Sequence, residues 1–375
     1  MLLSDICEII MGQSPSSDSY NVKGQGLPFF QGNADFGKLY PSVRLWCNCP
    51  IKKAEAGDLL VSVRAPIGAV NLANQKCCIG RGLAALRPYR DKCDAMYLYY
   101  LIKAGKNKLN WLGTGSTFKA ITRSSLLSFN VPDYCIAFQR KISGKLWSVD
   151  KLIHQRNEQL KLFDLLIQSR FIEMFGDPQS NCYNWKIVPL KDVMVGGALN
   201  GYFTKPQNYD IEGNVGVICV SDVVNRKYTN VNALRRAFAS EKDLQKYCVK
   251  YGDMLFCRSS LVKEGIGKAS IIPPHTENDI LFECHVIKIT LDMSRVIPEY
   301  LQALSITDFF RIQVIRQSKT ATMTTIGQKD IASVNILLPP MELQKRFTEF
   351  SAQIDKSKYR GRIFLRLLED ASHML

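Results

Sequence analysis

The side chains best suited to metal or thiol chemistry in this sequence are its cysteines and histidines, and their spacing argues against a metal centre. The chain has 12 cysteines and 4 histidines. The close cysteine pairs are Cys47/Cys49 and Cys77/Cys78, and neither repeats with the CxxC spacing of a tetrahedral zinc site. The histidines are scattered along the chain: His154, His275, His285 and His373. We therefore expect buried or partly exposed free thiols and no bound metal.

Motifs for nucleotide or covalent chemistry are also missing. Gly267-Lys268 lacks both the upstream glycine and the following Ser/Thr of a phosphate-binding loop, and Gly80-Arg81-Gly82 is too short for a dinucleotide fingerprint. The two Pro-Pro sites, at 273–274 and 339–340, lack the polar and aromatic neighbours with which an amino-methyltransferase grips a flipped base. Ser, Cys and His are too scattered to nominate a nucleophile. We predict that the chain is not an enzyme and carries no cofactor.

Charge gives the strongest indication of a partner. The chain has 375 residues, a net charge of +15 and 46% hydrophobic residues, which allows two or three domains and excludes wholesale disorder. Residues 1–130 hold 16 basic and 8 acidic side chains, and residues 185–338 hold 19 and 15, so the excess is +8 and +4 on two long stretches. This distribution favours nucleic acid over a membrane surface. With no long apolar run and no basic leader at residues 1–5, the protein is expected to be soluble and cytoplasmic.

The sequence repeats itself once, with an offset of 205 residues and no gap over some 40 positions. The matching pairs, read as first copy and second copy, are Thr117/Thr322, Ile121/Ile326, Leu126/Ile331, Asn130/Asn335, Gln139/Gln344 and Asp150/Asp355. Weaker matches lie upstream, where Gly57-Asp58-Leu59-Leu60 resembles Gly252-Asp253-Met254-Leu255, each followed by an arginine, Arg64 and Arg258. The repeat predicts a globular unit, a helix, a second globular unit and a second helix.

Two long helices are the clearest elements of this repeat. Between residues 139 and 175 there is no proline, and apolar residues recur at alternating spacings of three and four, at Leu146, Val149, Ile153, Leu160, Phe163, Ile167 and Met174. Arg156 and Arg170 interrupt this seam. A second helix is expected over 341–375, with an apolar set of Phe347, Phe350, Ile354, Phe364, Leu368, Ala371 and Leu375. Each seam needs burial, so we expect the two helices to pack together, antiparallel if the units are related by a two-fold.

The globular units are predicted to be α/β (α+β). Four apolar runs have strand composition, at 59–63, 215–220, 285–289 and 334–338, while 95–103 and 298–314 are expected to be helices. Turn-rich loops separate them at 12–16, 80–82 and 113–117. The second unit begins with residues 184–189 before Leu190, whereas the first begins almost directly at Leu3. The leading strand of the first unit is therefore predicted to be short.

Several strings resemble a known family, the specificity subunits of type I restriction-modification systems. The resemblance rests on residues 57–68 (GDLLVSVRAPIG), 80–86 (GRGLAAL), 115–118 (GSTF), Gln139, 150–153 (DKLI) and 171–178 (FIEMFGDP). It covers essentially the whole chain, although the second unit is more divergent and keeps only Gly265-Ile266-Gly267 of the Ala-Pro-Ile-Gly string.

The resemblance implies two target-recognition domains, at 1–138 and 185–338, separated by two conserved antiparallel coiled-coil helices, at 139–184 and 339–375, in a pseudo-two-fold repeat. Each domain would read one half of a split double-stranded DNA target, while the helices fix the spacer and dock two methylation subunits. A restriction subunit would join through them. S-adenosylmethionine would lie on the methylation subunits, and ATP and Mg on the restriction subunit.

The candidate DNA-contacting residues are polar or basic side chains in loops or beside strand ends. In the first domain they are Gln13, Ser14, Arg64, Arg81, Ser116, Thr117 and Lys119. In the second they are Lys205, Arg226, Arg258, Lys263, Lys268, Lys319 and Thr322. Arg64 and Arg81 could instead be structural, capping carbonyls or pairing with Asp58, and the repeated Thr117/Thr322 could serve the fold.

Two other functions fit part of this pattern. The chain could be a stand-alone nuclease or methyltransferase whose site has no recognisable motif, or a scaffold that assembles proteins through its helices without reading DNA. Turnover by the chain alone distinguishes the first, and salt-insensitive or absent DNA binding distinguishes the second.

Overall fold

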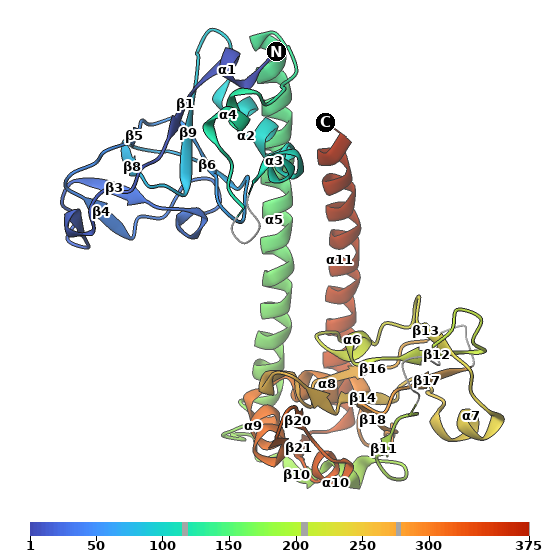
Figure 1. Cartoon of the computed structure of the whole chain (residues 1–375). Coiled ribbons are helices and arrows are strands. Elements are labelled where there is room, and N and C mark those ends of the chain that lie inside the picture. Colours follow the sequence, from blue (N-terminus) through green and yellow to red (C-terminus); the bar gives the residue numbers. More distant parts are fainter. Residues whose placement is uncertain (115–118, 204–208, 275–278, 375) are drawn as a thin grey trace. The chain divides into compact units, whose positions relative to one another are not determined.

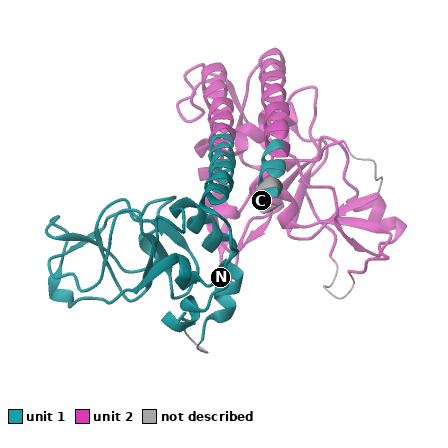
Figure 2. Cartoon of the chain, turned by 90° about the horizontal axis from the view of Figure 1, so that it is seen from above, with its two compact units in different colours: residues 1–156, 364–375 teal, residues 157–363 magenta. Residues whose placement is uncertain are grey.

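The computed structural model describes residues 1–114, 119–203, 209–274 and 279–374. Contacts divide the chain into two compact units (Figure 2): unit 1 comprises residues 1–156 and 364–375, and unit 2 comprises residues 157–363. Both long helices contribute to both units.

The two predicted long helices are present as α5 (Ile136–Phe175) and α11 (Met341–Met374). Helix α5 starts three residues earlier than the sequence pattern indicated. Its predicted seam is confirmed by burial, because the seam residues, including Arg156 and Arg170, are buried or half-buried while most of their neighbours are exposed. On α11, Phe364 departs from the prediction: it is 41% exposed, and the next residue, Leu365, is half-buried instead.

Contacts inside unit 2 show that the two helices run antiparallel. Phe171 of α5 packs edge-on against Phe347 of α11, with ring centroids 5.5 Å apart. About two turns earlier along α5, Asp164 accepts a hydrogen bond from Lys358, which lies later along α11. Residue numbers that fall on one helix while they rise on the other define an antiparallel pair.

The seam arginines, which interrupt the apolar pattern, stack on aromatic rings of the other helix. In unit 2 the guanidinium of Arg170 lies 5.6 Å from the centroid of Phe350. In unit 1 that of Arg156 lies 5.1 Å from the centroid of Phe364. A guanidinium over a ring face keeps its charge near water while its flat surface covers apolar area. The arginines therefore fit the interface.

Unit 1 contains two sheets (Figure 1). A four-stranded antiparallel sheet has the order β1-β9-β6-β7, and a five-stranded sheet has the order β2-β4-β3-β8-β5, in which β3 and β8 are parallel. The strands are β1 (Cys7–Met11), β2 (Tyr20–Asn21), β3 (Leu27–Phe30), β4 (Leu45–Cys47), β5 (Lys53–Ala54), β6 (Leu59–Ser62), β7 (Val70–Leu72), β8 (Cys77–Ile79) and β9 (Leu83–Pro88). The short helices are α1 (Leu3–Ile6), α2 (Ala95–Ala104), α3 (Lys106–Leu112) and α4 (Arg123–Leu127), with 3-10 turns at Ser17–Ser19 and Asn33–Asp35. Helix α2 covers the first sheet, where Leu98 and Ile102 join Leu59 and Val61 in one buried cluster.

Unit 2 repeats this strand order. Its four-stranded sheet is β11-β18-β14-β16, and its second sheet is β13-β12-β17, again with one parallel pair, β12 and β17. Two further strand groups are β10-β21 and β15-β20-β19. The strands are β10 (Lys186–Pro189), β11 (Leu199–Asn200), β12 (Val215–Ile218), β13 (Arg235–Ala237), β14 (Met254–Cys257), β15 (Ser259–Ser260), β16 (Ala269–Ile271), β17 (Ile280–Phe282), β18 (Val286–Ile289), β19 (Lys319–Thr320), β20 (Thr324–Thr325) and β21 (Asn335–Leu338). The helices are α6 (Val220–Val223), α7 (Glu241–Tyr247), α8 (Pro298–Ser305), α9 (Asp308–Gln317) and α10 (Gln328–Ala332), with 3-10 turns at Leu190–Val193 and Lys263–Gly265.

Most predicted elements are confirmed, including the four apolar strands and the helix that follows residue 94. The single helix expected over 298–314 is wrong, because it divides into α8 and α9. Thr307 lies between them in an extended conformation (φ −73°, ψ 154°), and its hydroxyl donates to the carbonyl of Leu304 at 2.7 Å. A threonine hydroxyl that bonds the preceding turn competes with the helical ladder, so the chain turns here.

The leading residues of the two units also differ in how far they pair. In unit 1 the pairing is reduced to one bridge between Leu2 and Asn130. In unit 2 the corresponding strand β10 pairs with β21 along its full length, from Lys186↔Leu338 to Pro189↔Asn335.

A buried glutamine holds each globular part to the start of its long helix. In unit 1, Gln139 Nε2 donates to the carbonyls of Lys92 (2.9 Å) and Tyr134 (2.8 Å), and its Oε1 accepts from the backbone N–H of Asp94 (3.0 Å). Asp94 is the N-cap of α2. The glutamine therefore satisfies three backbone groups that would otherwise be left without partners near a helix end.

The same arrangement occurs in unit 2. Gln344 Nε2 donates to the carbonyls of Arg295 (3.2 Å) and Pro339 (2.9 Å), and its Oε1 accepts from the N–H of Ile297 (2.9 Å), the N-cap of α8. Gln139 and Gln344 thus match in the sequence because each makes the same kind of hydrogen bonds in its own unit.

Replacing this glutamine should destabilise the protein. We expect Gln344→Ala to lower the free energy of unfolding by about 2–3 kcal/mol, because it leaves buried backbone groups without partners. Gln353→Ala is the matched control, since Gln353 is exposed on the same helix and should change the stability by less than about 0.5 kcal/mol. Urea unfolding followed by circular dichroism measures both, and equal stability of the two variants would contradict this role.

Candidate nucleic-acid interface

The candidate residues of unit 1 gather at one end of its four-stranded sheet. Because β1 and β6 are both antiparallel to β9, the ends of β1 and β6 meet the start of β9 at the same edge. Here the backbone N–H of Gln13 donates to the carbonyl of Ile79 (3.0 Å), and the N–H of Arg81 donates to Ser14 Oγ (3.1 Å). The loops that follow β1 and precede β9 are thereby joined.

Arg64 and Lys119 lie at the same edge. The N–H of Val63 donates to the carbonyl of Gly82 at 2.9 Å, and Arg64 forms a β-bridge with Ala120. We call Gln13, Ser14, Arg64, Arg81 and Lys119 the unit 1 cluster. The side chains of Arg64, Arg81 and Lys119 are exposed, so three cations face solvent from adjacent loops. Ser116 and Thr117, also predicted, lie outside the described residues.

The alternative that Arg64 or Arg81 pairs with Asp58 is wrong. The buried carboxylate of Asp58 is held by Arg87, whose Nε and Nη2 donate at 3.0 and 2.8 Å. Asp58 also accepts from the N–H of Glu55 at 2.8 Å, which closes the turn before β6. The two exposed arginines are therefore not needed to neutralise this carboxylate.

Sequence reasoning missed three residues near this edge. Gln31 follows β3, and its carbonyl lies 2.3 Å from where a side chain on Gly82 would begin, so only glycine fits there. Lys106 packs against Gly68 at the start of α3, and Trp111 on the same helix is 89% exposed. A polar residue directly after an apolar strand could have identified Gln31. Nothing in the sequence distinguishes Trp111 from a core residue.

In unit 2, Arg258 does not occupy the place that Arg64 has in unit 1. Counted from the shared Gly-Asp turn, Arg64 is seven residues after Gly57, whereas Arg258 is six after Gly252. Successive residues of a strand point to opposite faces, so a shift of one residue turns the side chain over. Pairing confirms the count, because Ser259 pairs with Thr325 as Arg64 pairs with Ala120.

Arg258 accordingly turns toward its own domain. It is half-buried, and its Nη1 donates to the carbonyl of Cys284 at 3.0 Å. The match drawn from sequence between Arg64 and Arg258 is therefore wrong. Among the described residues the Nε of Arg258 has no hydrogen-bond partner.

The remaining candidates of unit 2 form two groups. Lys319 on β19 and Thr322 in the turn before β20 are exposed beside β15, and Lys263 is exposed just after β15. Arg226 and Lys268 instead line a groove against the long helices, where Lys268 Nζ donates to Asn225 Oδ1. Lys205 lies outside the described residues.

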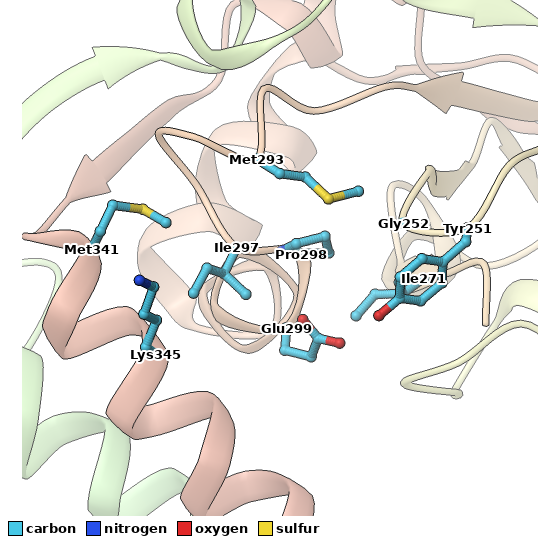
Figure 3. A pocket seen from close by; sticks show the side chains of 9 residues that line it. All are labelled: Tyr251, Gly252, Ile271, Met293, Ile297, Pro298, Glu299, Met341 and Lys345. Carbon is cyan, nitrogen blue, oxygen red and sulfur yellow. The ribbon is translucent and has the colours of Figure 1, made fainter. Parts of the chain in front are cut away.

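A smaller pocket of about 240 Å³ lies elsewhere in unit 2 (Figure 3). Its lining is mainly apolar, with Met293, Ile297, Pro298 and Met341 around it and Glu299 and Lys345 supplying charge. Flexible methionines adapt to varied apolar shapes. The pocket suits an apolar side chain better than a reacting substrate.

The described residues hold no group of three or more His, Cys, Asp or Glu side chains that could bind a metal ion. All 12 cysteines are free thiols. Burial raises the pKa of Cys7, Cys77, Cys78 and Cys93 to about 12, so these thiols stay protonated at neutral pH and are poor nucleophiles. In the described part of the chain, no helix is long and apolar enough to cross a bilayer.

Comparison with known proteins shows which proteins this chain resembles. Residues 1–162 match the family model described as "Type I restriction modification DNA specificity domain". Two relatives come from Methanocaldococcus jannaschii. One, assigned as the specificity subunit of type I restriction enzyme MjaX, is 44% identical over 40% of this chain and 36% of its own length. The other, the MjaIX specificity subunit, is 22% identical over 92% of this chain and 84% of its own length.

A solved structure extends the likeness to the whole fold. The crystal structure of a type I restriction-modification S subunit from M. genitalium superposes with a TM-score of 0.60 at 12% identity, over 100% of this chain and 93% of that one. The chain is thus similar to type I restriction-modification specificity subunits, through the family model over residues 1–162 and through these relatives. It aligns with little more than a third of the MjaX subunit's length.

The two arginines should respond differently to truncation. We expect Arg64→Ala to leave the thermal unfolding midpoint within about 1–2 °C of the wild type, because its side chain is exposed. Arg258→Ala should lower the midpoint by several degrees, since it removes a half-buried guanidinium that bonds Cys284. Scanning calorimetry measures both, and a larger loss for Arg64→Ala would overturn the assignment.

Proposed function

We propose that this chain is the DNA-reading subunit of a type I restriction-modification complex, in which each globular unit reads one half of a bipartite target. The observation that carries the proposal is the convergence of the unit 1 cluster. Five residues that are dispersed between positions 13 and 119 meet at one sheet edge, and the three cations among them are exposed. The repeated strand order of unit 2 supports a second reader built on the same plan, and so a pseudo-two-fold repeat.

The cluster has the chemistry that DNA reading requires. Arginine forms bidentate hydrogen bonds with the O6 and N7 of guanine, and glutamine pairs in the same manner with adenine, so Arg64, Arg81 and Gln13 are the candidate base readers. Lys119 suits a phosphate. Contacts to phosphates supply affinity that falls with salt, and contacts to base edges supply the sequence.

Exposed apolar residues on α5 support docking of the two methylation subunits. Leu162, Leu165, Leu166 and Ile172 are 62%, 56%, 44% and 46% exposed. At 100° per residue they fall on one face of the helix, away from the seam. A solvent-facing apolar stripe of this kind marks a protein interface. In this proposal the helix pair is a coiled coil that also sets the spacer, and the restriction subunit joins through the methylation subunits.

The chain is non-catalytic in this proposal. It has two target-recognition domains, 1–138 and 185–338, joined by the helical segments 139–184 and 339–375, and it acts in the cytoplasm. S-adenosylmethionine binds to the methylation subunits, and ATP and Mg bind to the restriction subunit. Incubating the purified chain alone with DNA, Mg²⁺ and S-adenosylmethionine tests this, and turnover would show that it is itself an enzyme.

The direct test is the sequence that the complex modifies. The chain, purified with its methylation subunits, should methylate adenines at a split site, mapped by sequencing the modified DNA. A continuous recognition sequence would contradict two separate readers. DNA binding that does not weaken with salt would instead favour a protein scaffold.

Modularity gives a second prediction. Replacing residues 1–138 with the equivalent domain of a relative should change one half of the modified sequence and leave the other half as it was. The reason is that the unit 1 cluster makes its contacts within that domain. A change in both halves, measured by the same sequencing, would contradict the assignment of one half-site to each unit.

A further inference from the structure

A groove of about 1120 Å³ lies within unit 2, between the long helices and the globular part. One side comes from α11, with Lys358 and Arg362. Opposite are Arg226, which follows α6, Lys268 at the start of β16, and Arg311 of α9. Arg226 and Arg362 are exposed, so the groove is accessible from solvent.

The groove carries an excess of positive charge that its own carboxylates do not neutralise. Six cations and three carboxylates line it. Each carboxylate already accepts a hydrogen bond from a neighbour: Asp164 from Lys358, Asp355 from Lys227, and Glu299 from the hydroxyl of Tyr228. Four cations are left without an acidic partner among the described residues: Arg226, Lys268, Arg311 and Arg362.

Two of these cations are held in place by neutral groups, and Lys268 keeps donors for a ligand. Lys268 Nζ donates to Asn225 Oδ1, and an ammonium has two further N–H bonds. Arg311 Nη2 donates to the carbonyl of Glu264 at 3.0 Å, while its buried Nη1 has no hydrogen-bond partner among the described residues.

We propose that this groove binds the phosphodiester backbone of the DNA duplex next to the half-site that unit 2 reads. The inference rests on the proposed function and adds a binding site outside the reading loops. Guanidinium groups match phosphate geometry, and several cations spread along an open groove suit a chain of phosphates better than a single anion.

The groove is continuous with a candidate DNA-reading loop. This favours DNA over an acidic protein segment as the ligand of the groove. The loop that carries Lys263 runs from β15 to Lys268, so its last residue forms part of the groove. Arg311 bonds the carbonyl of Glu264 in the same loop. The phosphate backbone of a DNA strand that leaves the reading loop would therefore meet the groove cations next.

The test uses the complex of the full chain with its methylation subunits. The double variant Arg226→Ala/Arg362→Ala removes two exposed cations of the groove, and Lys191→Ala/Lys242→Ala is the matched control, since both lysines are exposed outside it. Kd for a target duplex is measured by fluorescence anisotropy across a salt series. We expect the slope of log K against log salt to fall in magnitude by about 2 for the groove variant, roughly 0.9 per lost phosphate contact.

The control should keep the wild-type slope, and both variants should modify the same sequence, because phosphate contacts do not specify bases. Ethylation interference identifies the phosphates that binding requires. The phosphates that contact the groove should no longer be identified with the groove variant. An unchanged slope and interference pattern would overturn the proposal, as would loss of affinity for the methylation subunits with DNA binding intact. If the wild-type complex reads no specific sequence, the proposed function fails. If the wild type reads its target and the groove variant binds DNA as the wild type does, only the groove proposal is rejected.

Discussion

The structure depends on two buried glutamines, each of which ties a globular part to the start of a long helix. Gln139 and Gln344 each satisfy two carbonyls and the N–H of a helix N-cap residue. Because a side-chain amide has donors and an acceptor at fixed positions, it determines both distance and orientation. A globular part attached in this way moves with its helix, and the positions of its loops then follow from the helix.

The pairing of the two long helices in turn depends on an interface that accommodates charged side chains. Arg156 and Arg170 lie at seam positions and cover the rings of Phe364 and Phe350. Apolar residues outside the seam, such as Leu162 and Leu165, stay exposed. One helix face is therefore used within the chain, and another is left for the partners that we propose.

Features that follow from regular spacing along the chain could be predicted from the sequence. Side-chain orientations and sites assembled from distant segments could not. Seam spacing located both helices to within three residues, and the repeat anticipated the paired glutamines. The arginine match failed because a one-residue difference between Arg64 and Arg258 is small in an alignment but reverses a side chain on a strand. The groove in unit 2 is assembled from segments as distant as Asp164 and Arg362, so no local pattern indicates it.

Changing the length of the two long helices tests the proposed function most directly. Inserting one heptad into α5 after Arg156 and one into α11 after Ile363 keeps the seam in phase and lengthens the pair by about 10 Å. The complex should then methylate the same two half-sites with a spacer longer by about three base pairs, at roughly 3.4 Å each. An unchanged spacer, or a change in either half-site, would contradict the claim that the helices set the distance between two independent readers.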